Sequence, residues 1–328
     1  TENLATSAWT VAPAELLLLE ERARDPAILL SWQQLKAKAK RALAKWLSEE
    51  MGAVVDCTAL FDVAVVSAEA DRAGAVRMYL HALHRAGLAL KEGATPAAPR
   101  LFLLCDAVGE TAGPVAETVA LARQLAELFA GEERLRDRVQ FLVLPFDRLR
   151  VAYRVLAAAD LVECREDLGS WAVAAAINAA ALACTVYETD SWKSRDLWKK
   201  RIGNEHIFCA ELTYVTSPSP LTFLREETEE RGCLARFGPA IAAALQAAKE
   251  QRAFEVRRLV DWVIVGEQRV FEAYLEMQRG VDARFAESKQ WAGLTMISAL
   301  RAAHFSTETT VACLLANIPG LTPRQALD

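Results

Sequence analysis

The sequence predicts an α/β fold in which a Rossmann-like parallel sheet carries helices on both faces, with N-terminal helices before it and a C-terminal helical subdomain after it. Two observations lead to this class. Short apolar, β-branched runs alternate with longer stretches whose apolar residues recur at helical spacing. The short runs are apolar throughout, which is typical of strands buried on both faces of a parallel sheet.

The N-terminal part is predicted to be helical. Residues 13–24 and 30–51 place apolar side chains every three to four positions, opposite a face rich in Lys and Glu. The first strand, residues 59–66, comes next and leads into an amphipathic helix over residues 72–90.

The same alternation repeats along the rest of the sheet-forming region. Each further strand is a short apolar run, and segments with helical spacing separate the runs. The predicted strands are 100–105, 138–144, 161–164, 181–187 and 206–209, and the predicted helices between them include 114–131, 149–159 and one between the strands 161–164 and 181–187.

Beyond residue 212 the helical spacing continues without strands. The predicted helices there are 221–231, 239–251, 252–265, 267–284, 288–303 and 307–316. The polar, Pro-containing stretch 213–220 marks the change. We therefore predict an N-terminal helical segment packing on the core (1–56), a Rossmann-like α/β core (57–212) and a C-terminal helical subdomain (213–328).

Charge and hydropathy exclude some classes of partner. The chain has 38 basic against 43 acidic residues and no long block of one sign, which argues against nucleic acid. The longest apolar run, residues 171–187, is rich in alanine and shorter than the roughly 20 residues that a membrane helix needs. No transmembrane segment of its own is predicted.

The cysteines and histidines give no metal site. Seven cysteines are scattered without a C-x-x-C pair, which predicts reduced thiols rather than disulfides or structural zinc. His81 and His84 stand three apart on a predicted helix, but no third ligand is evident. We interpret them as part of a partly exposed helix face and predict no metal.

Several motifs, in order along nearly the whole chain, resemble glycogen and starch phosphorylases. The segment 59–63 (ALFDV) resembles the family's SLFDV, and residues 151–161 (VAYRVLAAADL) resemble its KVIPAADL region. Near the C-terminus, residues 269–278 (RVFEAYLEMQ) and 305–310 (FSTETT) are similar to the family's KVFADYEAY and FSSDRT. The resemblance implies one half of a two-domain glycosyltransferase fold, in which the active site lies between two such domains.

The resemblance also implies that the cofactor site is degenerate. In the family, pyridoxal phosphate forms a Schiff base with the lysine of EASGTGNMK, since only an amine can form that imine. The matching run here is residues 166–179, and the lysine position holds Ala174. We therefore predict no cofactor and no catalytic residue.

Other positions of the family's phosphate site are changed in the same direction. Its lysine–arginine pair falls at Val66 and Ser67, its phosphate-facing serine at Leu168, and a small glycine at Trp171. Its glycine- and lysine-containing loop falls near residues 105–110, where two acids stand instead. Glu166 is the one candidate for a residual sugar contact, with a solvated loop acid as its plainer interpretation.

No other catalytic motif replaces the lost one, so we predict a pseudoenzyme that acts as a structural accessory subunit of a larger multi-protein assembly. A start at Thr1 without methionine is compatible with a removed presequence, and a mitochondrial location is favoured over a cytoplasmic one. The alternatives are a non-catalytic carbohydrate- or nucleotide-sugar-binding module and an enzyme with a new mechanism. Candidate interface anchors, which could equally be packing residues, are Trp9, Trp32, Trp46, Trp192 and Trp198.

Overall fold

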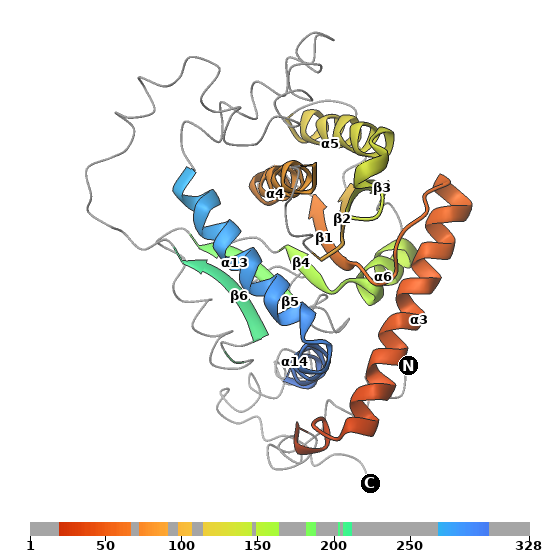
Figure 1. Ribbon diagram of the computed structural model, residues 1–328, viewed down its shortest axis with the longest axis vertical. Coiled ribbons are helices and arrows are strands. Elements are labelled where there is room, and N and C mark those ends of the chain that lie inside the picture. The colour runs from red at the N-terminus through yellow and green to blue at the C-terminus, as the bar shows by residue number, and fades with distance from the viewer. Residues whose placement is uncertain are drawn as a thin grey trace, which may run out of the picture.

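The computed structural model describes nine stretches of the chain (Figure 1). They are residues 20–66, 72–90, 98–106, 114–145, 149–163, 182–187, 203, 206–211 and 268–301. The predicted helices 221–231, 239–251, 252–265 and 307–316, the predicted helix after residue 164, and most of the predicted helix 13–24 lie outside them.

The centre of the fold is a parallel sheet with the order β3-β2-β1-β4-β5-β6. Every pair of neighbouring strands is parallel, which confirms the predicted sheet. The direction of strand addition reverses between β1 and β4, so the two lie side by side at the middle of the sheet. The strands are β1 (Leu60–Val66), β2 (Arg100–Asp106), β3 (Val139–Pro145), β4 (Leu161–Glu163), β5 (Leu182–Tyr187) and β6 (Ile207–Glu211).

Helices cover both faces of the sheet, as the sequence predicts (Figure 1). Apolar side chains of α4 (Arg72–Leu90), α5 (Pro114–Gly131) and α13 (Gln268–Ala286) belong to the core cluster on one face. Those of α3 (Pro26–Met51) and α6 (Leu149–Ala158) belong to the cluster on the other face. The helix α14 (Ser288–Arg301) contacts both α13 and α3, and the short 3-10 helix η3 (Glu133–Leu135) leads into β3.

The alternation of side chains along each strand divides the core between these two faces. In β1, Leu60 and Ala64 belong to the cluster under α4, whereas Phe61 and Val63 belong to the cluster under α3. All four are buried, as expected of a strand covered on both sides. The two-sided burial explains why the strand is apolar on both faces, with Asp62 as its one charged residue, rather than at every second position.

The helix α3 begins at Pro26, four residues before the predicted start at residue 30. The reason is a local cap: the Asp25 carboxylate accepts a hydrogen bond of 2.8 Å from the backbone N–H of Ala27, and proline is well tolerated at the first helical position. At the other end Gly52 adopts φ +66°, a left-handed conformation that favours glycine. The described elements otherwise start and end within two residues of the predicted bounds.

None of the helices in the described ranges is long and apolar enough to cross a membrane. The division of the chain at residues 57 and 213 stays a prediction.

Candidate functional site

The predicted site residues lie at or follow the carboxyl ends of β1 and β4 along the chain. In open parallel sheets ligands bind at the carboxyl ends of the strands, where the strand order reverses. That point is the carboxyl ends of β1 and β4, which are paired through Ala64 and Glu163. The chain leaves β1 at Val66 and leaves β4 at Glu163. Of the predicted site residues the structure describes Val66, while the others lie outside the described residues: Ser67, Glu166, Leu168, Trp171 and Ala174.

Val66 is packed into the core. Its side chain is 0% exposed and belongs to the same apolar cluster as Ala75 and Tyr79 of α4. Its strand neighbour is Asp106, the last residue of β2. The position that the resemblance assigns to a phosphate-binding lysine therefore holds a buried apolar side chain beside an acid.

The end of β2 carries an acid that is paired with an exposed cation, next to a buried thiol. Asp106 is partly exposed, and its carboxylate lies 3.5 Å from a guanidinium nitrogen of the exposed Arg123. Cys105 is buried, and its burial raises the pKa of the thiol, so the thiolate form that could act as a nucleophile is disfavoured. Neither Asp106 nor Cys105 supplies a positive charge for a dianion, and the nearby Arg123 is paired with Asp106.

The packing of Val66 gives a first prediction. Val66→Thr keeps the shape of the side chain but adds a hydroxyl, and a buried hydroxyl without a partner costs about 1–3 kcal/mol. The free energy of unfolding, measured with urea, is expected to fall by that amount. Val65→Thr on the same strand is the control, because Val65 is only half-buried and should cost less. Equal effects of the two changes would show that the Val66 position is open to water.

Beneath the switch point lies a cluster of buried polar side chains, which we term the buried network. It comprises Asp62 of β1, His81 of α4, Arg100 of β2, Glu163 of β4, and Tyr274 and Gln278 of α13. These residues come from three adjacent strands and two helices, although the sequence separates them by up to about two hundred positions. The network therefore ties α13 to the centre of the sheet.

Arg100 is the hub of the buried network. Its side chain is fully buried, and its guanidinium donates to the Gln278 side-chain oxygen at 2.9 Å. The guanidinium also lies 3.2 Å from the ring nitrogens of His81 and 3.6 Å from the Asp62 carboxylate. Burial lowers the pKa of His81, and Arg100 lowers it further, so the neutral ring can accept from the guanidinium.

Glu163 is the second centre of the buried network. It accepts a hydrogen bond from the Tyr274 hydroxyl and another, of 3.0 Å, from the Gln278 side-chain nitrogen. Burial raises the pKa of Asp62, Arg100 opposes that rise, and Glu163 adds to it. Since Asp62, Arg100 and Glu163 are all buried, the network is suited to holding elements together rather than to exchanging groups with a substrate.

A second buried charge pair lies on the opposite face of the sheet. Lys40 of α3 is 2.5 Å from the carboxylate of Asp160, which directly precedes β4. The Lys40 ammonium also donates to the carbonyl of Ala59 at 2.7 Å, and the Asp160 carboxylate accepts from the N–H of Phe61 at 2.8 Å. The pair fixes α3 to the strands β1 and β4.

One interpretation from the sequence is corrected by these contacts. The face of α4 that carries His81 is not partly exposed: His81 is 3% exposed and packs edge-on against Phe102 and Tyr274, whereas His84 is half-buried. In the described ranges, no three His, Cys, Asp or Glu side chains form a group that could hold a metal ion.

Trp32 and Trp46 make packing contacts within the chain, which is the alternative to a role as interface anchors. The indole N–H of Trp32 donates to the Thr295 hydroxyl of α14 at 3.0 Å. Trp46 packs against the α3-side core cluster, with the guanidinium of Arg154 5.7 Å from its ring centre. Trp9, Trp192 and Trp198 lie outside the described residues.

The buried network was missed by the sequence reasoning, although a signal for it existed. Asp62, Arg100 and Glu163 are ionisable residues inside short strands that are otherwise apolar. A charged residue is almost never fully buried unless it is paired, so each predicts a partner. The spacing of the sequence does not show that Arg100 and Glu163 both contact Gln278 of α13.

The chain is similar to a known protein family and to several known proteins. A family model described as carbohydrate phosphorylase matches residues 1–186. The chain is similar to the glycogen phosphorylase of Pasteurella multocida, with 24% identity over 92% of this chain and 38% of the relative. It is also similar to those of Haemophilus influenzae (22% identity, 93% and 38%) and Bacillus subtilis (20% identity, 96% and 40%). The chain thus spans 38–40% of the length of these relatives.

Proposed function

Because this chain belongs to the carbohydrate phosphorylase family, we propose that it is a phosphorylase-like protein without catalytic activity that serves as a structural accessory subunit of a larger assembly. The relatives that it matches are named glycogen phosphorylase, so activity would be the default expectation for a family member. The proposal therefore depends on what this chain has changed.

The observation that carries the proposal is the full burial of the Val66 side chain. The resemblance places a phosphate-binding lysine there, and a cation at that position would have to reach water or an anion. Val66 is instead fully buried in the apolar cluster beneath α4. An apolar side chain that fills a former polar site costs activity and favours packing.

A second argument supports the loss of catalysis. The position that corresponds to the cofactor lysine is Ala174, and alanine has no amine with which to form an imine. Two independent requirements of the family's chemistry, the cofactor anchor and the cation for phosphate, are therefore unmet in the same chain.

The accessory role is supported by the buried polar contacts that hold the fold together. The buried network and the Lys40–Asp160 pair join six elements, the strands β1, β2 and β4 and the helices α3, α4 and α13, so the centre of the fold keeps strong internal contacts. A stable fold without its chemistry is suited to presenting surfaces to other proteins. The carbohydrate-binding alternative depends on Glu166, which lies outside the described residues.

Incubation with pyridoxal phosphate tests the loss of catalysis. The purified chain, treated with pyridoxal phosphate and borohydride, is expected to carry no stoichiometric pyridoxyl-lysine by mass spectrometry. It is also expected to release no glucose 1-phosphate from glycogen and inorganic phosphate. The reason is that neither the imine nor the phosphate cation is available at Ala174 and Val66.

The Pasteurella multocida relative, handled in parallel, serves as the control for both readouts. A single pyridoxylated lysine together with glucose 1-phosphate release would overturn the proposal. Retardation of an inactive chain in glycogen-containing gels would favour the carbohydrate-binding alternative, and a chain recovered without companion proteins after gentle extraction would contradict the accessory role.

A further inference from the structure

The helix α3 has one long side that is buried and another that is exposed to solvent. Its inner face carries Leu43 and Leu47, both fully buried against the sheet, together with the buried Lys40. The side chains at positions 28, 31, 35, 38, 42 and 45 recur every three to four residues and are all exposed. We call this row, with the flanking Gln34 and Arg41, the outer face of α3.

The outer face has a charge of one sign. Residues 26–48 contain five Lys and Arg residues and no Asp or Glu. Lys36 and Lys40 turn toward the body of the protein, where they donate to the carbonyls of Ala157 and Ala59. The remaining three, Lys38, Arg41 and Lys45, are exposed on the outer face.

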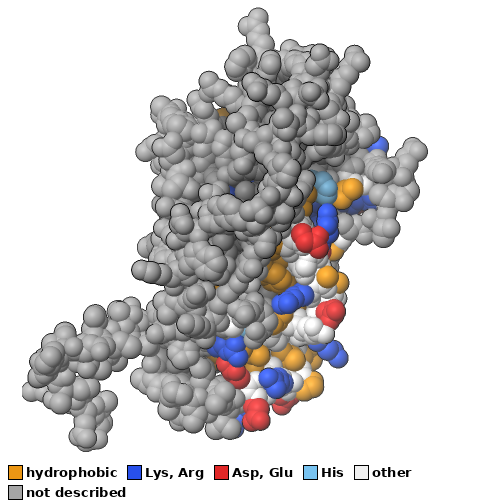
Figure 2. Space-filling model, turned by 90° about the vertical axis from the view of Figure 1, so that its left-hand side faces the viewer, with side chains coloured by type: hydrophobic (Ala, Val, Ile, Leu, Met, Phe, Trp, Pro, Cys, Tyr) orange, Lys and Arg blue, Asp and Glu red, His pale blue; other side chains and the backbone are white. Residues whose placement is uncertain are grey.

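These three cations are not neutralised locally. The Lys45 ammonium lies 3.7 Å from Glu49, and both side chains are well exposed, so the pair is weak. Lys38 and Arg41 make no ion pair or hydrogen bond with any residue of the described ranges. By contrast, the face in Figure 2, opposite the side on which α3 lies in Figure 1, shows acidic and basic side chains interspersed.

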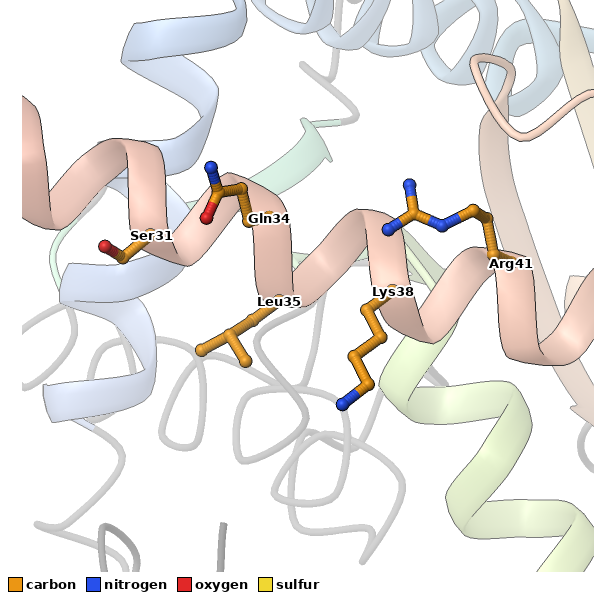
Figure 3. A pocket seen from close by; sticks show the side chains of 5 residues that line it. All are labelled: Ser31, Gln34, Leu35, Lys38 and Arg41. Atoms are coloured by element: carbon orange, nitrogen blue, oxygen red, sulfur yellow. The ribbon is translucent and has the colours of Figure 1, made fainter.

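The outer face is also hollowed. A groove of about 650 Å³ lies along the middle of α3 and is lined by Ser31, Gln34, Leu35, Lys38 and Arg41. Figure 3 shows that Leu35 and Lys38 point to one side of the helix while Gln34 and Arg41 point to the other. Leu35 is 50% exposed, so it adds an apolar side chain to the groove beside the cations Lys38 and Arg41.

We propose that the outer face of α3 is a docking surface for an acidic helical segment of a partner protein. An amphipathic helix lying along α3 could cover Ile28 and Leu35 with apolar residues while its carboxylates meet Lys38, Arg41 and Lys45. Complementary charge gives such a contact its orientation and its selectivity. The inference rests on the proposed accessory role and names the chemistry of one partner.

A lipid surface fits this face less well than a protein segment. A helix that lies on a membrane needs a broad apolar face for the acyl chains. The apolar side of α3 is already buried against the sheet through Leu43 and Leu47. Ile28 and Leu35 on the outer face are separated by Ser31, which suits interdigitation with side chains better than insertion.

Photo-crosslinking of the full chain in its source organism tests the proposal. A benzophenone side chain at Gln34, on the outer face, is compared with one at Glu127, which is exposed on α5 beyond the other face of the sheet. Native-gel separation reports whether the assembly forms, and mass spectrometry identifies the segment joined to the probe. An adduct from Gln34 to a companion segment rich in Asp and Glu at helical spacing is the expected result.

Charge reversal provides a second readout. The double change Lys38→Glu and Arg41→Glu is expected to weaken retention of the chain in the assembly by at least about tenfold and to lower the salt concentration that releases it. The matched control is Arg134→Glu with Arg136→Glu, two exposed cations at the 3-10 helix η3, which packs against α4 and α5. Equal behaviour of the two double variants would overturn the docking surface.

The outcomes separate the two proposals. If the chain migrates as a free monomer, the accessory role fails and the docking surface fails with it. If the assembly forms but Gln34 gives no adduct, or one with lipid, with a second copy of this chain or with a basic segment, the docking surface alone is overturned.

Discussion

Replacement of Arg100 by methionine is expected to lower the free energy of unfolding by about 3–5 kcal/mol, because removal of one partner leaves the others buried without compensation. The guanidinium is fully buried, and it serves Asp62, His81 and Gln278 at once. Methionine fills similar space but offers no donor. The measurement is urea unfolding of the purified chain, followed by circular dichroism.

The stability lost in Arg100→Met is expected to change with pH in a defined direction. Burial already raises the pKa of Asp62, and Arg100 holds the rise in check. Without Arg100, Asp62 keeps its proton in the folded state at pH values at which the unfolded chain has released it. The stability is therefore present below the ordinary Asp pKa, and it is lost as the pH rises through the raised pKa of Asp62 in the folded state. The destabilisation should therefore be larger at about pH 8 than at about pH 5.

Two further variants make the Arg100 result specific. Arg123→Met removes an exposed guanidinium from its pair with Asp106, and it should cost less than about 1 kcal/mol. Arg100→Met with Asp62→Leu removes both charges of one pair and should recover part of the loss, since apolar replacement of a buried pair is often neutral. A single variant as mild as Arg123→Met would mean that Arg100 is not a hub.

Replacement of Lys40 by methionine is expected to cost about 3–5 kcal/mol as well, and it acts on the other face of the sheet. It leaves the buried carboxylate of Asp160 with the N–H of Phe61 but without its ion-pair partner, and it leaves the carbonyl of Ala59 without the Lys40 donor. Since Lys40 joins α3 to β1 and β4, proteolysis of α3 should also become faster.

The matched control is Lys45→Met, five residues further along α3. Lys45 is 78% exposed and, among the described residues, pairs only with the exposed Glu49, so its loss should cost less than about 0.5 kcal/mol. Similar urea midpoints for the two variants would contradict the anchoring role of Lys40.

The sheet and its covering helices could be predicted because each strand is a local signal. β1 and β2 are apolar at all but one and two of their positions, and amphipathic helices follow them at 72–90 and 114–131, which is enough to predict parallel strands buried on both sides. The start of α3 was missed because an N-cap at Asp25 extends the helix beyond its apolar periodicity.

The predicted site could be followed only in part. Val66 was assigned to the lost phosphate position from the resemblance, and its burial agrees with a filled site. Whether Glu166 keeps a sugar contact stays a prediction, because it lies outside the described residues.

Residue identity and short-range periodicity are enough to predict the fold class, the lack of an amine at Ala174 and the positive charge of α3. The packed fold is needed to show that Asp62, Arg100, Glu163 and Gln278 share one network, and that Leu35 faces outward while Leu43 faces the core. The physical reason is that a buried charge must find its partner in space, and Arg100 and Gln278 meet only after the strands and α13 have packed together.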